Sequence, residues 1–180
     1  YDNGTGSATV LEAARLLRQY RFQRTVRLIL FTGEEQGLYG GAAYAADHTL
    51  TSVLGVLNLD MFGYDSNADR CFEVHAGTLP ASIDVGNCFV ASVGSYALGL
   101  NRDFLTTTAT NRSDHASFWN VGTGAIEIAE NFFNDSQAGG CVGADANPFY
   151  HTNNDRIASN MTPSFGLSIA KAALATISAM

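Results

Sequence analysis

Residues 25–35 have the sequence TVRLILFTGEE, an apolar and β-branched run that ends at a glycine and two glutamates. Such a run is typical of a strand that is buried on both faces of a sheet. A second run of this kind, VLGVLNLD over residues 53–60, ends at an aspartate. Residues 38–47 lie between the two runs and are rich in alanine, so we expect a helix there. This strand–helix–strand order predicts an α/β fold.

The rest of the chain continues the alternation. We expect helices over residues 7–20, 81–98, 114–119 and 163–180, and strands over residues 70–75, 103–107 and 124–129. Residues 131–150 form a long polar, glycine-rich loop, of a length that usually indicates function or disorder. The sequence therefore predicts an α/β, three-layer sandwich of helices around a mostly parallel mixed sheet.

Composition limits the classes of partner. The 180 residues carry 10 Lys and Arg against 17 Asp and Glu, a formal net charge of −7, which argues against a nucleic-acid partner and favours a cationic guest. No apolar run approaches the roughly 18 residues of a membrane span, so no membrane segment is expected. Three cysteines, none in C-x-x-C spacing, argue against a thiolate zinc site. They leave at least one unpaired, and a Cys71–Cys88 bridge would be compatible with a secreted protein.

Acidic residues and a histidine follow the predicted strands, at the sheet edge where ligands bind in such folds. Glu34 and Glu35 follow the first strand, Asp60 ends the second, Asp2 precedes the first helix and His151 follows the long loop. Taken singly, Asp2, Asp60 and His151 are also explained as a helix-start, a turn and a surface residue. Taken together, oxygen ligands with one imidazole suit zinc or a similar divalent ion in a catalytic site. Adjacent glutamates point in different directions, so one can bind the metal while the other faces a metal-bound water.

Five segments of the sequence resemble the co-catalytic di-zinc aminopeptidases of the secreted leucyl aminopeptidase type. Relatives of that family include glutamate carboxypeptidase, glutaminyl cyclase and the transferrin receptor. The matching segments, in the family's order, are DNGTGSATVLEAA (2–14), GEEQGLYG (33–40), NLDMFG (58–63), NRSDHASF (111–118) and FYHTNND (149–155). The resemblance implies a zinc exopeptidase-like fold over residues 1–180.

The resemblance implies the metal ligands. Asp2 is expected to bridge two zinc ions. Glu35 and His151 are expected to bind one of them, and Asp60 the other. The implied cofactor is therefore Zn²⁺, two ions in the intact family and one complete site in this chain.

The resemblance also implies the reaction, hydrolysis of the N-terminal peptide bond of peptides with a free N-terminus. Glu34 is expected to be the general base, and Tyr150 the hydrogen-bond donor to the tetrahedral oxyanion. Arg112 is expected to hold the substrate's N-terminus through its backbone carbonyl. A secreted or extracellular location is implied as well.

One ligand of the family has no counterpart in the sequence. It is a histidine in a His-x-Asp motif upstream of the bridging aspartate, and no His-x-Asp occurs in these 180 residues. We therefore expect residues 1–180 to be the C-terminal part of a longer catalytic domain, without its N-terminal strands. Such a piece should expose a sheet edge and apolar surface.

Other functions stay open at this point. A glutaminyl cyclase of the same fold would use a single zinc held by an Asp, a Glu and a His. A non-catalytic receptor-like module would be expected to have lost metal ligands or Glu34, and a carboxypeptidase would share the metal site. Substrate side-chain preference and oligomeric state are not indicated by the sequence.

The remaining histidines are interpreted as structural. His48 lies at a helix end and His75 in a strand, and His115 is expected to pack or hydrogen-bond beside a helix. Ser113, Asp114 and His115 are consecutive, so they cannot form the relay of a serine hydrolase.

Overall fold

The computed structural model describes residues 2–133, 140–157 and 161–180. Its described sheet has four strands in the order β1-β4-β2-β3. β1 (Val56–Leu59) runs parallel to β4 (Ala125–Glu130), and β2 (Cys71–His75) runs parallel to β3 (Asn101–Leu105). β2 and β4 are antiparallel, so the sheet is mixed and mostly parallel, as predicted.

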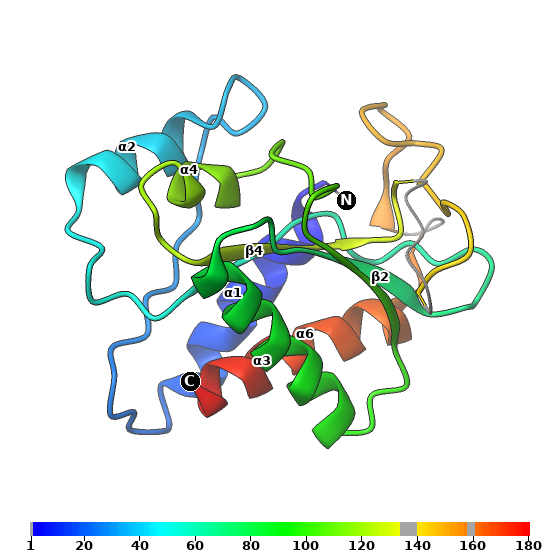
Figure 1. The fold of residues 1–180 in the computed structure, drawn as a ribbon. Coiled ribbons are helices and arrows are strands. Elements are labelled where there is room, and N and C mark those ends of the chain that lie inside the picture. Colours follow the sequence, from blue (N-terminus) through cyan, green and yellow to red (C-terminus); the bar gives the residue numbers. More distant parts are fainter. Residues whose placement is uncertain (1, 134–139, 158–160) are drawn as a thin grey trace.

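Helices cover both faces of the sheet (Figure 1). One layer contains α1 (Gly4–Leu17), α3 (Pro80–Ser95) and α6 (Pro163–Ala179), and the opposite layer contains α2 (Tyr39–Asp47) and α4 (His115–Trp119). This arrangement confirms the predicted α/β, three-layer sandwich. Every residue of β2 and β4 is buried, as expected for central strands between two helical layers.

The main hydrophobic core lies between the sheet and the layer of α3 and α6. Phe72 and Ile128 of the strands meet Phe89 of α3 and Phe165 of α6 there, and all four side chains are fully buried. A smaller core around Phe118 lies beside α2 and α4. The two cores fix the central strands, whose ends carry the candidate site.

The strand predicted over residues 25–32 is wrong. No described strand pairs with this segment, and most of its residues are exposed or half-buried, with Leu30 55% exposed. A β-strand requires the ladder of a neighbouring strand. No neighbouring strand of the described residues provides this ladder. A cavity of about 860 Å³, lined by residues 23–36 and by residues 49–60, lies beside the segment.

β1 is an edge strand of the described sheet, next to this cavity. Leu28, Leu30 and Leu54 are exposed around it. The expectation of an open sheet edge with apolar surface is therefore confirmed for the described residues.

The cysteines pair differently from the bridge considered above. Cys71 at the start of β2 is bonded to Cys141, with the two Cα atoms 5.6 Å apart, and Cys88 is free. Sequence spacing alone does not report which cysteines approach within bonding distance. Part of the long loop predicted over residues 131–150 lies outside the described residues. No described helix combines the length and apolarity that a membrane crossing requires.

Asn3 fixes the start of α1, three residues before the predicted one. Its side chain accepts a hydrogen bond from Gly6 N at 2.9 Å and donates one to Leu59 O at 2.7 Å. A Cβ at Gly6 would overlap the carbonyl oxygen of Leu59. The close approach of α1 to the end of β1 therefore requires glycine at this position.

Gly6→Ala is expected to destabilise the protein by about 1–3 kcal/mol, because the new methyl group must push α1 away from β1. Gly4→Ala is the matched control, since a Cβ there meets nothing within 4 Å and the substitution should be neutral or slightly stabilising. Chemical denaturation of both variants measures the difference. Equal free energies of unfolding would contradict the proposed close contact.

Candidate metal centre

Asp2 is placed by the first turn of α1 and by the loop that follows His151. Its backbone N donates to Asp155 Oδ2 at 3.0 Å, and Asp155 Oδ1 in turn accepts from Asn147 Nδ2 at 2.8 Å. The neighbouring Asn3 is bonded to the end of β1. Residues distant in sequence therefore hold this carboxylate from two sides.

Glu34 and Glu35 occupy a tight turn before α2. The backbone N atoms of Gly37 and Leu38 both donate to Glu34 O at 2.9 Å, and Tyr39 N donates to Gly33 O at 3.0 Å. Glu34 is half-buried, whereas the side chain of Glu35 is about half exposed. The turn thus gives two adjacent carboxylates different surroundings, as the sequence predicted.

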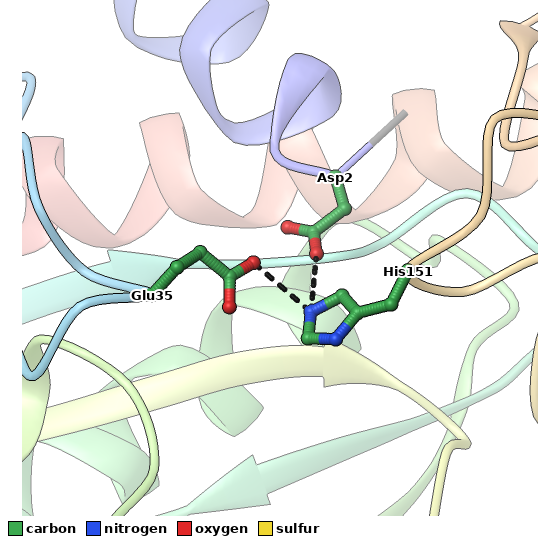
Figure 2. A group of neighbouring side chains, drawn as sticks. All are labelled: Asp2, Glu35 and His151. Atoms are coloured by element: carbon green, nitrogen blue, oxygen red, sulfur yellow. Dashed lines mark hydrogen bonds and ion pairs between the residues drawn. The ribbon is translucent and has the colours of Figure 1, made fainter.

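Three of the four predicted metal ligands meet in one place (Figure 2). His151 Nε2 lies 3.0 Å from Glu35 Oε1 and 3.6 Å from Asp2 Oδ2, and one ligand atom from each residue lies within 4.8 Å of the others. Ligand atoms around a tetrahedral zinc ion are separated by about 3.3 Å, given bonds of 2.0–2.1 Å. One imidazole and two carboxylates at these separations fit zinc.

Asp60 lies beside this group and is more deeply buried. Its carboxylate is close enough to raise the pKa values of both Asp2 and Glu34 by charge repulsion. Ser113 Oγ donates to Asp60 Oδ2 at 2.6 Å, and Asn58 Nδ2 donates to Ser113 Oγ at 2.7 Å. Sequence reasoning missed this support from Asn58 and Ser113, although both belong to segments that it singled out.

The pKa values of the carboxylates at the site are raised by burial and by mutual repulsion. Burial raises the pKa of Asp2 to about 6, and the charges of Asp60 and Glu35 add to the effect. Burial raises the pKa of Glu34 to about 7, with further repulsion from Asp60 and Glu35. A bound cation would relieve both effects, because it neutralises the ionised carboxylates.

Tyr150 and Arg112 border the same site. Burial raises the pKa of Tyr150, as do the charges of Asp2 and Glu35, whereas Arg112 acts in the opposite direction. The Tyr150 ring stacks on His151 at 3.7 Å between centroids. All seven predicted site residues are therefore brought to one end of the sheet.

The sequence matches a known peptidase family over nearly its whole length. The model of peptidase family M28 matches residues 1–177. The chain belongs to peptidase family M28. The resemblance noted from the five segments is thereby confirmed.

Related proteins of this family carry aminopeptidase names. Aminopeptidase YwaD of Bacillus subtilis is 31% identical over 160 residues, which are 87% of this chain and 32% of that protein. The M28 chain therefore spans about a third of the length of this relative.

Solved aminopeptidase structures share the fold. LapA aminopeptidase of Legionella pneumophila superposes with a TM-score of 0.77 at 26% identity, covering 97% of this chain and 44% of that one. BSAP, a zinc aminopeptidase from Bacillus subtilis, gives 0.72 at 25% identity, covering 98% and 40%. Porphyromonas gingivalis glutaminyl cyclase gives 0.62 at 14% identity, covering 97% and 60%, a likeness of fold alone.

Without metal, the protein should lose stability as the pH rises from about 4 to about 7. The pKa values of Asp2 and Glu34 are raised from 3.8 and 4.5 to about 6 and 7, so the folded state binds more protons than the unfolded state in this range. Melting temperatures in chelator should therefore fall with pH, and added Zn²⁺ should raise them most at the upper end. Glu34→Gln should flatten the dependence in chelator. A chelated protein that is most stable at pH 7.5 and unaffected by Zn²⁺ would contradict this account.

Proposed function

We propose that the protein is a zinc-dependent aminopeptidase, acting on peptides with a free N-terminus. The observation that carries the proposal is the meeting of Asp2, Glu35 and His151 at zinc-binding separations, with Glu34 beside them. Aminopeptidase names among the M28 relatives support the same activity. The ion would supply a Lewis acid that polarises the scissile carbonyl and acidifies water.

Glu34 is the general base of this proposal. Its raised pKa, about 7, matches the requirement for a group that accepts a proton from the attacking water and returns it to the leaving amine near neutral pH. Its neighbour Glu35 belongs to the ligand group with His151 and Asp2. One of the two adjacent glutamates would therefore bind the metal while the other accepts the proton.

Tyr150 and Arg112 act on the substrate. The Tyr150 hydroxyl, whose raised pKa keeps it protonated, donates a hydrogen bond to the oxyanion that develops during attack. The backbone carbonyl of Arg112 binds the α-ammonium group, and the surrounding carboxylates attract the same positive charge. A free N-terminus is therefore the recognised feature of the substrate.

A single-zinc glutaminyl cyclase is the second candidate. The group of Asp2, Glu35 and His151 is sufficient for one ion, and the cyclase from P. gingivalis shares the fold. A carboxypeptidase would use the same metal site on a peptide with a free C-terminus. We also propose a secreted or extracellular location, because the Cys71–Cys141 disulfide persists in oxidising compartments.

The activity is tested with leucine anilide, N-acetyl-leucine anilide and an N-terminal glutamine peptide. Only the unblocked anilide should be hydrolysed. Glu34→Gln should lower kcat by at least about a hundredfold while zinc content is unchanged, because it removes the base and leaves the ligands. Equal cleavage of the blocked anilide would refute an aminopeptidase, and cyclisation of the glutamine peptide without hydrolysis would favour the cyclase. Metal binding without turnover would favour a receptor-like module.

We propose further that these residues are part of a longer catalytic domain. The length of the M28 relatives supports this, as do the edge strand β1 and the cavity beside it. In this proposal, further strands and a further ligand near Asp60 would come from outside residues 1–180, since Asp60 has no imidazole partner among the described residues.

Residues 1–180 alone should bind no more than one zinc ion tightly, because only one complete ligand group is described. The product of the complete reading frame should bind two. Elemental analysis after exhaustive dialysis distinguishes the cases. Two tightly held zinc ions in the 180-residue chain would contradict the proposed division.

A further inference from the structure

Two buried histidines form hydrogen bonds with the middle of the loop that carries Arg112 and Ser113. The loop, residues 106–114, joins β3 to α4. Thr110 N donates to His75 Nδ1 at 3.1 Å, and Thr110 O lies 3.0 Å from His115 Nε2. Both imidazoles are fully buried, His75 in β2 and His115 at the start of α4. The backbone N–H and the backbone carbonyl of Thr110 are therefore each hydrogen-bonded to a buried imidazole.

These contacts fix the tautomer of each ring. His75 Nδ1 accepts from Thr110 N, so its proton is on Nε2, which donates to Glu73 Oε2 at 2.9 Å. His115 Nε2 donates to the Thr110 carbonyl, and burial lowers the pKa of His115 to about 4, so the ring is neutral and its Nδ1 is unprotonated. Both histidines are thus neutral and carry their proton on Nε2.

Glu127 of β4 supports the His115 tautomer. Its Oε2 lies 3.4 Å from His115 Nδ1, and both atoms are buried without a hydrogen-bond partner among the described residues. A neutral His115 beside a protonated Glu127 leaves no charge on either buried side chain. Burial favours this state, since it raises the pKa of Glu127 well above the ordinary value and lowers that of His115 to about 4.

Thr110 lies close in the chain to Arg112 and Ser113, two residues at the candidate site. Arg112 N donates to Thr110 Oγ1 at 3.3 Å, and Ser113 Oγ donates to Asp60 Oδ2 at 2.6 Å. Aromatic side chains also pack against the two imidazole rings. The ring centroids of Trp119 and His115 are 4.4 Å apart and those of Phe133 and His75 are 5.4 Å apart, both in an edge-on arrangement. A shift of Thr110 would therefore be passed to Arg112 within two residues.

We propose that His75 and His115 are positioning residues, which clamp Thr110 and thereby set the Arg112 carbonyl for the substrate's α-ammonium group. This inference rests on the proposed aminopeptidase function. Both histidines act through the loop, because the contacts described above join them to Thr110 and to buried glutamates.

Matched pairs of variants test the clamp, because Asn places a polar atom near Nδ1 of the replaced histidine and Gln places one near Nε2. His75→Asn and His115→Gln keep the bond to Thr110. His75→Gln and His115→Asn lose the bond to Thr110 and place their polar atoms on the side of Glu73 and Glu127, respectively. The second pair should raise KM for leucine anilide about tenfold, the effect of one net hydrogen bond, with kcat nearly unchanged.

The first pair should retain KM within about threefold, even where its melting temperature falls as far as that of the second pair. A merely structural role predicts the same kinetic change for the Asn variant and the Gln variant of each histidine. That result, or a loss confined to kcat, would overturn the proposal.

A second measurement does not depend on activity. Long-range ¹H–¹⁵N correlation spectra of the wild-type imidazoles should show His75 and His115 as neutral Nε2–H tautomers at pH 6–7, with their Nδ1 atoms unprotonated. An Nδ1–H tautomer or an imidazolium at either position would overturn the clamp. Failure of hydrolysis with the expected tautomers would instead count against the proposed function alone.

Discussion

The repulsion among the carboxylates at the end of the sheet is the constraint on which the site depends. Asp2, Glu34, Glu35 and Asp60 come from three separate segments; burial raises the pKa values of Asp2, Glu34 and Asp60, and neighbouring carboxylates raise them further. The half-buried position of Glu34 makes the cost of ionising it larger, because water screens the charges poorly there. Only one histidine belongs to the group. A bound divalent cation would neutralise these charges, which explains how so many acidic side chains can lie together.

Holding these groups together requires rigid support behind them. Asn3 joins the start of α1 to the end of β1, Asp155 holds the backbone of Asp2, and Ser113 holds Asp60. Each of these bonds joins residues more than 50 positions apart. The positions of the candidate ligands are therefore set by the packed sheet and its two helical layers, and the buried histidines hold the loop that carries Arg112 in the same way.

The sequence predicted the site better than it predicted the edge of the sheet. The acidic residues and the histidine were predicted to converge from their types and from the resemblance of the five segments, although the strand expected before Glu35 does not form. Residues 25–32 have the composition of a buried strand, yet composition reports a local preference and not the presence of a neighbour to pair with. The partner of Cys71 and the grip of His75 and His115 on Thr110 also depend on distances that no spacing reveals.

The most direct test of the metal centre is anomalous diffraction at the zinc absorption edge from crystals of the zinc-loaded protein. We expect a peak about 2.0–2.2 Å from His151 Nε2 and from carboxylate oxygens of Asp2 and Glu35. A peak bound by other residues, such as the free Cys88, would contradict this expectation, as would zinc-loaded crystals with no peak between these three side chains.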